Sequence, residues 1–129
     1  MNTIYRRRLV KEIHNVEHDA SPYYSIYVQP DNIYAWSVNI HSLNDSRHKG
    51  KNYEITITIP NNYPFIPPSI KFITPLSLDC INRRTGEFSI DLLRDNWSPS
   101  LTVEHVILTV CSVITDNEPT RRSPRLNYI

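Results

Sequence analysis

Two short segments that combine proline with aromatic residues decide how this sequence can fold. Residues 63–68 read Tyr-Pro-Phe-Ile-Pro-Pro, and residues 96–102 read Asn-Trp-Ser-Pro-Ser-Leu-Thr. Such segments are typical of rigid, shaped connections rather than flexible linkers. The chain holds 10 prolines but only 2 glycines, Gly50 and Gly86, so we expect neither a glycine-rich phosphate loop nor a dinucleotide-binding fingerprint.

Runs of alternating apolar residues lie on both sides of the first segment. They cover residues 24–28, 34–40, 53–59 and 70–72. A period of two indicates strands with one buried face, and the short, turn-rich links favour an antiparallel meander. A polar loop over residues 42–52 separates the second strand from the third.

Two helices are expected at the ends of this sheet. Leu9, Ile13 and Val16 recur at helical spacing, and Ser21-Pro22 ends that helix. Thr102 is expected to cap a second helix with an apolar stripe formed by Val103, Val106, Ile107, Val110 and Ile114. Residues 74–100 show no period, and an irregular loop of that length is usually functional. The sequence therefore predicts one α+β domain over residues 1–129, with an irregular tail at 120–129.

Composition narrows the classes of function. Apolar residues make up 40% and charged residues 21% of the 129, and the net charge is +1, so we expect a soluble globular protein without a nucleic-acid or membrane partner. Cys80 and Cys111 are too few for a disulfide framework, which favours a reducing compartment, cytoplasmic or nuclear. His41, His48 and His105 have no metal-ligand spacing with either cysteine, so no metal or other cofactor is expected.

The two proline-aromatic segments, with Ile-Asp-Leu-Leu at residues 90–93 between them, resemble the ubiquitin-conjugating enzyme family. The resemblance covers roughly residues 4–119 and includes Trp36 and the turn at residues 44–46. It implies the UBC-like α+β fold: an N-terminal helix, a four-stranded antiparallel meander, a long active-site-type loop and a central helix. It also implies transthiolation, in which a cysteine thiolate takes up ubiquitin as a thioester and passes it to a lysine.

The sequence departs from the family pattern at the catalytic positions. Residues 86–93 read Gly-Glu-Phe-Ser-Ile-Asp-Leu-Leu, which places Ser89 where the family has its cysteine. The His-Pro-Asn motif, whose asparagine supports the loop and the oxyanion, is replaced by Leu78-Asp79-Cys80. The family's acidic residue near the incoming lysine falls around residues 120–122, and its two usual C-terminal helices are missing. The chain thus resembles a catalytically inactive ubiquitin-conjugating enzyme variant that acts by binding.

An active transferase is the alternative. It requires either that Ser89 is an engineered replacement of a natural cysteine or that Cys80, in the same loop, is the nucleophile. Cys80 also has a purely structural interpretation, as a small residue that fills the place of the family's asparagine. For Cys111 the structural interpretation is packing in the core.

The resemblance also implies a docking surface for RING-type ligases, formed by two loop tips and basic residues of the first helix. The partner-binding residues are Arg7, Arg8, Lys11, Pro64, Phe65, Trp97, Ser98 and Pro99. The expected partner is a RING-type ligase or its adaptor complex, an active conjugating enzyme, or ubiquitin itself. The structural alternative is a solvated helix face beside prolines that only shape their turns.

Overall fold

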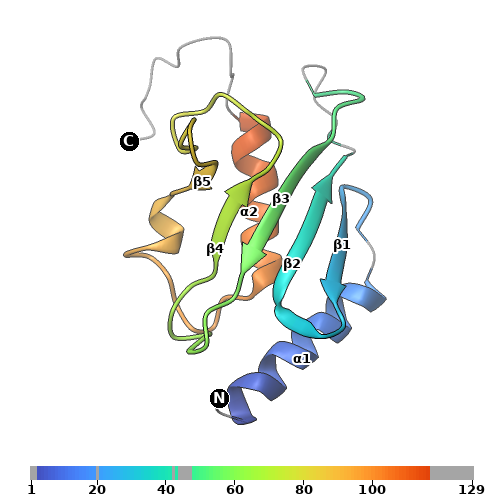
Figure 1. Ribbon diagram of the computed structural model, residues 1–129, viewed down its shortest axis with the longest axis vertical. Coiled ribbons are helices and arrows are strands. Elements are labelled where there is room, and N and C mark those ends of the chain that lie inside the picture. Colours follow the sequence, from blue (N-terminus) through green and yellow to red (C-terminus); the bar gives the residue numbers. More distant parts are fainter. Residues whose placement is uncertain (1–2, 20, 42, 44–47, 117–129) are drawn as a thin grey trace.

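The computed structural model describes residues 3–19, 21–41, 43 and 48–116. A helix, α1 (Thr3–His18), precedes a sheet, and a second helix, α2 (Val103–Asp116), follows it (Figure 1). The strands are β1 (Tyr24–Gln29), β2 (Asn32–Ile40), β3 (Tyr53–Thr58), β4 (Ser69–Phe72) and β5 (Glu87–Phe88), and a 3-10 turn, η1 (Asp91–Leu93), lies between the sheet and α2. The arrangement confirms the predicted UBC-like α+β class.

In the described part of the chain the sheet is a meander of five strands in the order β1-β2-β3-β4-β5, with every neighbouring pair antiparallel. The sequence predicted four strands. The fifth lies within residues 74–100, where Ile70 pairs with Phe88 and Lys71 with Glu87. Two residues are too few to show a period, so only the tertiary pairing with β4 reveals this strand.

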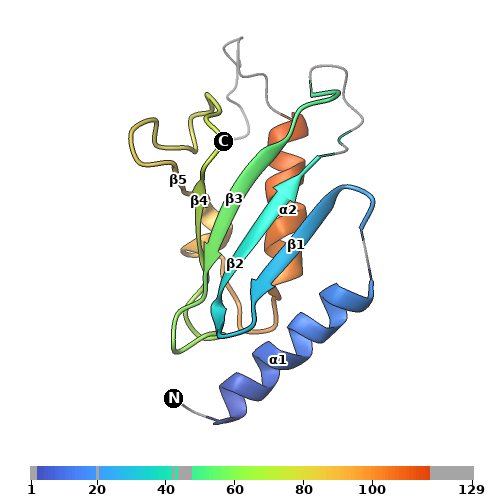
Figure 2. The same ribbon diagram turned by 45° about the vertical axis from the view of Figure 1, so that its right-hand side comes forward.

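The core lies between the sheet and α2, which covers one face of the strands (Figures 1 and 2). Trp36, Val38 and Ile40 alternate on β2 as predicted, and all three are buried. The predicted stripe of α2 is buried as well, and the amide of His105 donates to the Thr102 hydroxyl at 3.1 Å, which confirms Thr102 as the cap. The opposite face of the sheet is polar, with a shallow groove lined by Thr56, Thr58, Ser69, Ile70, Lys71, Thr85 and Glu87.

The loop after β2 is fastened by a buried histidine. His48 is 2% exposed, and its Nε2 lies 3.1 Å from the carbonyl oxygen of Ile114 near the end of α2. Because a carbonyl can only accept, Nε2 carries the hydrogen, and Nδ1 accepts from the Tyr53 hydroxyl at 2.6 Å. Burial raises the pKa of Tyr53. His48 is therefore a structural residue that ties the loop to the second helix.

None of the helices described is long and apolar enough to cross a membrane. Three sequence predictions concern the tail: the irregular segment at 120–129, the acidic position at 120–122 and the missing C-terminal helices. All three lie outside the described residues.

Candidate functional site

Ser89 is exposed at the end of a small hairpin that lies within the stretch at residues 74–100. Ile81 forms an isolated antiparallel bridge with Phe88, and the amide of Asn82 donates to the carbonyl of Glu87 at 2.9 Å. The Asn82 side chain accepts from the amides of Arg84 and Thr85 at 2.9 and 3.0 Å, which closes the turn. The hairpin therefore presents Ser89 in a defined position at the surface.

Gly86 attaches this hairpin to β4. The amide of Phe72 donates to the carbonyl of Gly86 at 2.7 Å. A Cβ at residue 86 would lie 2.3 Å from the carbonyl oxygen of Phe72, and the φ angle of +82° is one that side chains rarely adopt. A glycine is required here for both reasons.

The structure brings Ser89 and Cys80 together, as the alternative with a second nucleophile requires. The amide of Ser89 donates to the carbonyl of Cys80 at 2.9 Å. Cys80 is half-buried against the core, and burial raises the pKa of its thiol, with a smaller contribution from the charge of Asp79. Within the described ranges, no side chain donates to or accepts from the Ser89 hydroxyl. Among the described residues, no hydrogen bond or charge activates the Ser89 hydroxyl, and burial disfavours the Cys80 thiolate.

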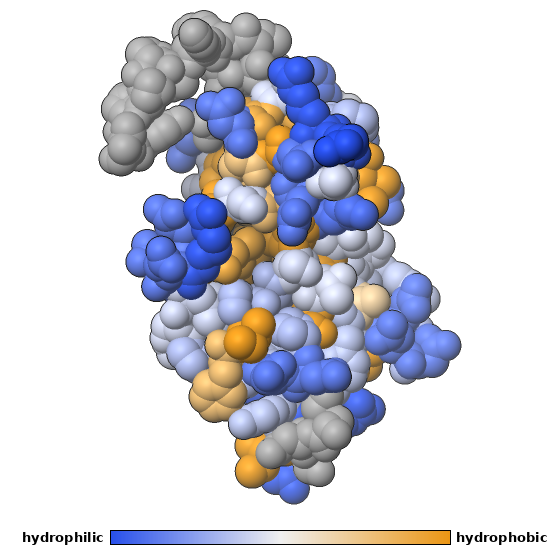
Figure 3. All heavy atoms as spheres, turned by 60° about the vertical axis from the view of Figure 1, so that its left-hand side comes forward, coloured by the Kyte–Doolittle hydropathy of each residue, from blue (hydrophilic) through white to orange (hydrophobic). Residues whose placement is uncertain are grey.

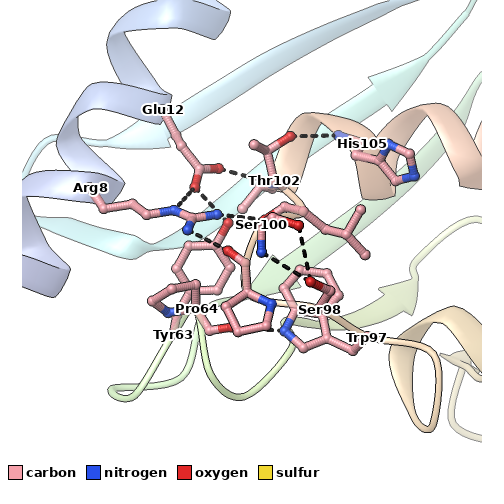
Figure 4. A network of polar contacts seen from close by, with 12 residues as sticks. Arg8, Glu12, Tyr63, Pro64, Trp97, Ser98, Ser100, Thr102 and His105 are labelled. Atoms are coloured by element: carbon pink, nitrogen blue, oxygen red, sulfur yellow. Dashed lines mark hydrogen bonds and ion pairs between the residues drawn. The ribbon is translucent and has the colours of Figure 1, made fainter.

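The second group of predicted residues lies in the loops before β4 and before α2, which the structure joins directly. The indole Nε1 of Trp97 donates to the carbonyl of Pro64 at 2.8 Å, and the rings of Trp97 and Tyr63 lie 6.2 Å apart (Figure 4). The two proline-aromatic segments therefore form one unit although more than thirty residues separate them.

Glu12 of α1 holds this unit to both helices. Its Oε2 accepts from the Tyr63 hydroxyl at 2.6 Å and from Arg8 Nε at 3.0 Å, while Oε1 accepts from the amide of Val103 at 2.9 Å (Figure 4). Burial, followed by the contact with Glu12, raises the pKa of Tyr63. Sequence reasoning missed Glu12. The available signal was an acidic residue three positions after Leu9, inside the apolar stripe of the helix.

Arg8 acts within the fold. Besides Glu12, its guanidinium donates to the carbonyls of Pro99 and Leu101, the latter at 2.6 Å, and lies over the Tyr63 ring at 5.5 Å. The predicted contact residue Arg8 is thus engaged internally, and Pro64 is buried. In the protein alone, Arg8 and Pro64 therefore stabilise the loops that form the predicted docking surface.

The exposed part of that surface is apolar with a basic margin. Phe65 is 56% exposed, Ile66 47% and Ile4 69%, and the Tyr5 ring meets Phe65 edge-on at 5.3 Å. Hydrophobic side chains are visible at the lower end of the molecule in Figure 3, the end at which Figure 1 places the loops before β4 and α2. We call this the loop-tip surface; it comprises Ile4, Tyr5, Arg7, Lys11, Phe65, Ile66, Ser98 and Pro99, of which Tyr5 and Ser98 are half-buried. Trp97 is half-buried behind it.

No three histidine, cysteine, aspartate or glutamate side chains in the described part of the chain gather in a way that could hold a metal ion.

A known protein family and several solved structures are similar to this chain. The family model described as "Ubiquitin-conjugating enzyme" matches residues 8–127. The crystal structure of a ubiquitin conjugating enzyme E2 from Plasmodium falciparum is similar at 28% identity with a TM-score of 0.79, over 87% of this chain and 99% of that one. The E2 domain of a Toxoplasma gondii ubiquitin conjugating enzyme is 28% identical with a TM-score of 0.77, over 92% of this chain and 79% of that one.

The chain belongs to the ubiquitin-conjugating enzyme family. Membership implies interaction with ubiquitin and with its activating enzymes or ligases.

Proposed function

We propose that this protein is a non-catalytic member of its family and that it works in the ubiquitin pathway as a binding or scaffold subunit. One observation supports the proposal: Ser89, which the sequence resemblance aligns with the family's cysteine, is exposed and has no base bonded to its hydroxyl among the described residues. A serine hydroxyl is a poor nucleophile unless a neighbouring base takes its proton.

Cys80 does not compensate for this loss. Its thiol is half-buried and its pKa is raised, so the thiolate that transthiolation needs is scarce at neutral pH. Its backbone carbonyl is occupied by Ser89 in the hairpin, which suits a residue that packs the loop.

The binding role rests on the loop-tip surface. An exposed aromatic ring and two exposed isoleucines beside Arg7 and Lys11 have the composition of a protein interface, with an apolar centre and a charged rim. The partner we propose is a RING-type ligase or its adaptor complex, with an active conjugating enzyme and ubiquitin as the other candidates. Cytoplasmic or nuclear localisation follows from that partnership.

A charging assay tests the proposal. The protein is incubated with activating enzyme, ATP and ubiquitin, and adducts are read on a non-reducing gel alongside the Ser89→Cys and Cys80→Ala variants. We expect no adduct on the unaltered chain or on Ser89→Cys, because the supporting asparagine is missing as well.

Two results would overturn the proposal. A thiol-labile adduct that disappears in Cys80→Ala would identify Cys80 as the nucleophile. Charging of Ser89→Cys would show that only the cysteine is missing, which is the result expected if Ser89 replaces a natural cysteine.

A further inference from the structure

The outer edge of β1 is the long open edge of the sheet. Among the described residues, β1 has a neighbouring strand only on one side, where it pairs with β2, and it forms the margin of the sheet in both views (Figures 1 and 2). At the opposite margin β5 is only two residues long. Natural proteins usually protect a long edge with charges, prolines or bulges, because its unpaired backbone groups invite another strand.

The register shows which backbone groups are unpaired. The amide of His41 donates to the carbonyl of Tyr23 at 2.9 Å, and these residues face each other in the register that pairs Tyr24 with Ile40. In an antiparallel pair, hydrogen-bonded residues alternate with residues whose backbone groups point away. The amides and carbonyls of Tyr24, Ile26 and Val28 therefore point outward, and no described residue bonds to them.

Charge does not protect this edge. No charged residue occurs between Asp19 and Asp31. On the outer face of the sheet β1 presents Ser25 and Tyr27, the latter 59% exposed, and on the inner face Ile26 and Val28 remain partly exposed at the margin of the core. Such a strand has the composition that favours β pairing.

Prolines limit the strand at both ends, and the pairing of β1 with β2 becomes irregular between Val28 and Gln29. The prolines also select one partner register for residues 24–28. Pro22 and Pro30 each lie four positions from Ile26. Two antiparallel copies of β1 centred on Ile26 would place Pro22 of one copy opposite Pro30 of the other, outside the paired region. A centre on Tyr24 or Val28 would instead place a proline, which has no amide hydrogen, opposite an outward-pointing residue.

We propose that β1 pairs with the β1 of a second copy of this chain, antiparallel and two-fold symmetric about Ile26. Tyr24 then faces Val28 of the other copy and Ile26 faces Ile26, so three residue pairs, each exchanging two hydrogen bonds, form six bonds in total. The pairing is self-complementary, as two-fold symmetry requires. Because both β1 edges are then paired with each other, no further copy can add at β1 and the assembly stops at a dimer. This inference is independent of the loop-tip surface.

The dimer is expected to be weak and reversible, because one strand edge buries less than the roughly 1,000 Å² of a stable interface. On the outer face, Ser25 of one copy lies directly opposite Tyr27 of the other, and such pairs respond to charge. Ser25→Lys with Tyr27→Lys sets like charges against each other in both symmetric pairs. Ser25→Lys with Tyr27→Glu sets opposite charges there and is the matched control, since it differs only at residue 27.

Sedimentation equilibrium over a concentration series up to the solubility limit tests the pairing. We expect a monomer–dimer equilibrium for the unaltered chain, a dissociation constant at least about tenfold higher for the double-lysine variant, and restored dimerisation for the lysine–glutamate variant. Thermal unfolding checks that both variants are folded. An unaltered chain that stays monomeric, one that grows beyond a dimer, or two variants that dimerise alike would overturn the proposal.

Discussion

Glu12 of α1 accepts a hydrogen bond from the backbone amide of Val103, the first residue of α2, at 2.9 Å. The two residues are 91 positions apart, and the carboxylate also accepts from Tyr63 in the loop before β4. A carboxylate at the start of a helix satisfies an amide that has no partner within the helix and interacts favourably with the helix dipole. One buried side chain therefore links the two helices to the first proline-aromatic segment, and Arg8, which bonds to the same carboxylate, reaches the second through the carbonyl of Leu101.

Replacing Glu12 with alanine should lower the free energy of unfolding by about 2 kcal/mol or more, because it leaves the Tyr63 hydroxyl and the Val103 amide without acceptors. Urea denaturation measures the loss. Glu12→Gln keeps the volume and one acceptor and should cost less. In the Glu12→Ala background, Tyr63→Phe should cost less than it does alone, because both changes remove the same hydrogen bond. Strictly additive costs would contradict this network.

Phe65→Ala should abolish partner binding while changing the free energy of unfolding by less than about 1 kcal/mol, because the ring is 56% exposed. Binding is measured by pull-down with a panel of RING-type ligases. Ile73→Ala is the matched control, since Ile73 is 51% exposed and lies outside the loop-tip surface. A stability loss of about 3 kcal/mol or more would instead make Phe65 a core residue. Equal loss of binding in both variants would place the interface elsewhere.

The strands and the apolar stripe of α2 could be predicted because each depends on a local period. Trp36, Val38 and Ile40 alternate in the sequence and are buried in the structure. The alternation predicted the sheet up to β4, and it failed at β5, where two residues pair only because Gly86 docks the hairpin on β4.

The burial of polar residues could not be predicted from the local periodicity of the sequence. Glu12 and His48 both look like solvated residues in the sequence, and each is satisfied by partners that come from distant parts of the chain. Burial of such a group depends on those partners, so no local pattern reports it. For the same reason Arg8 resembled a surface cation, whereas its guanidinium bonds to the carbonyl of Leu101.

Gly86→Ala should cost about 2 kcal/mol or more, since an added Cβ meets the Phe72 carbonyl and the backbone angle is unfavourable. Gly50→Ala is its matched control: φ there is +75°, but nothing lies within 4 Å of the added atom, so only the backbone cost of about 1 kcal/mol remains. Urea denaturation of both variants gives the difference. Equal costs would mean that contact with Phe72 contributes nothing.

Cys80 should react slowly with iodoacetamide at neutral pH. Burial disfavours the charged thiolate, so the raised pKa of Cys80 means less thiolate at any given pH than in a free thiol with a pKa of about 8.5. The rate, followed by mass spectrometry of the peptide that contains Cys80, should therefore rise only at a higher pH than for the same sequence as an unstructured peptide. Faster reaction of the folded protein at pH 7 would mean an activated thiolate. The non-catalytic assignment would then lose its second support, since a nucleophile would be available beside Ser89.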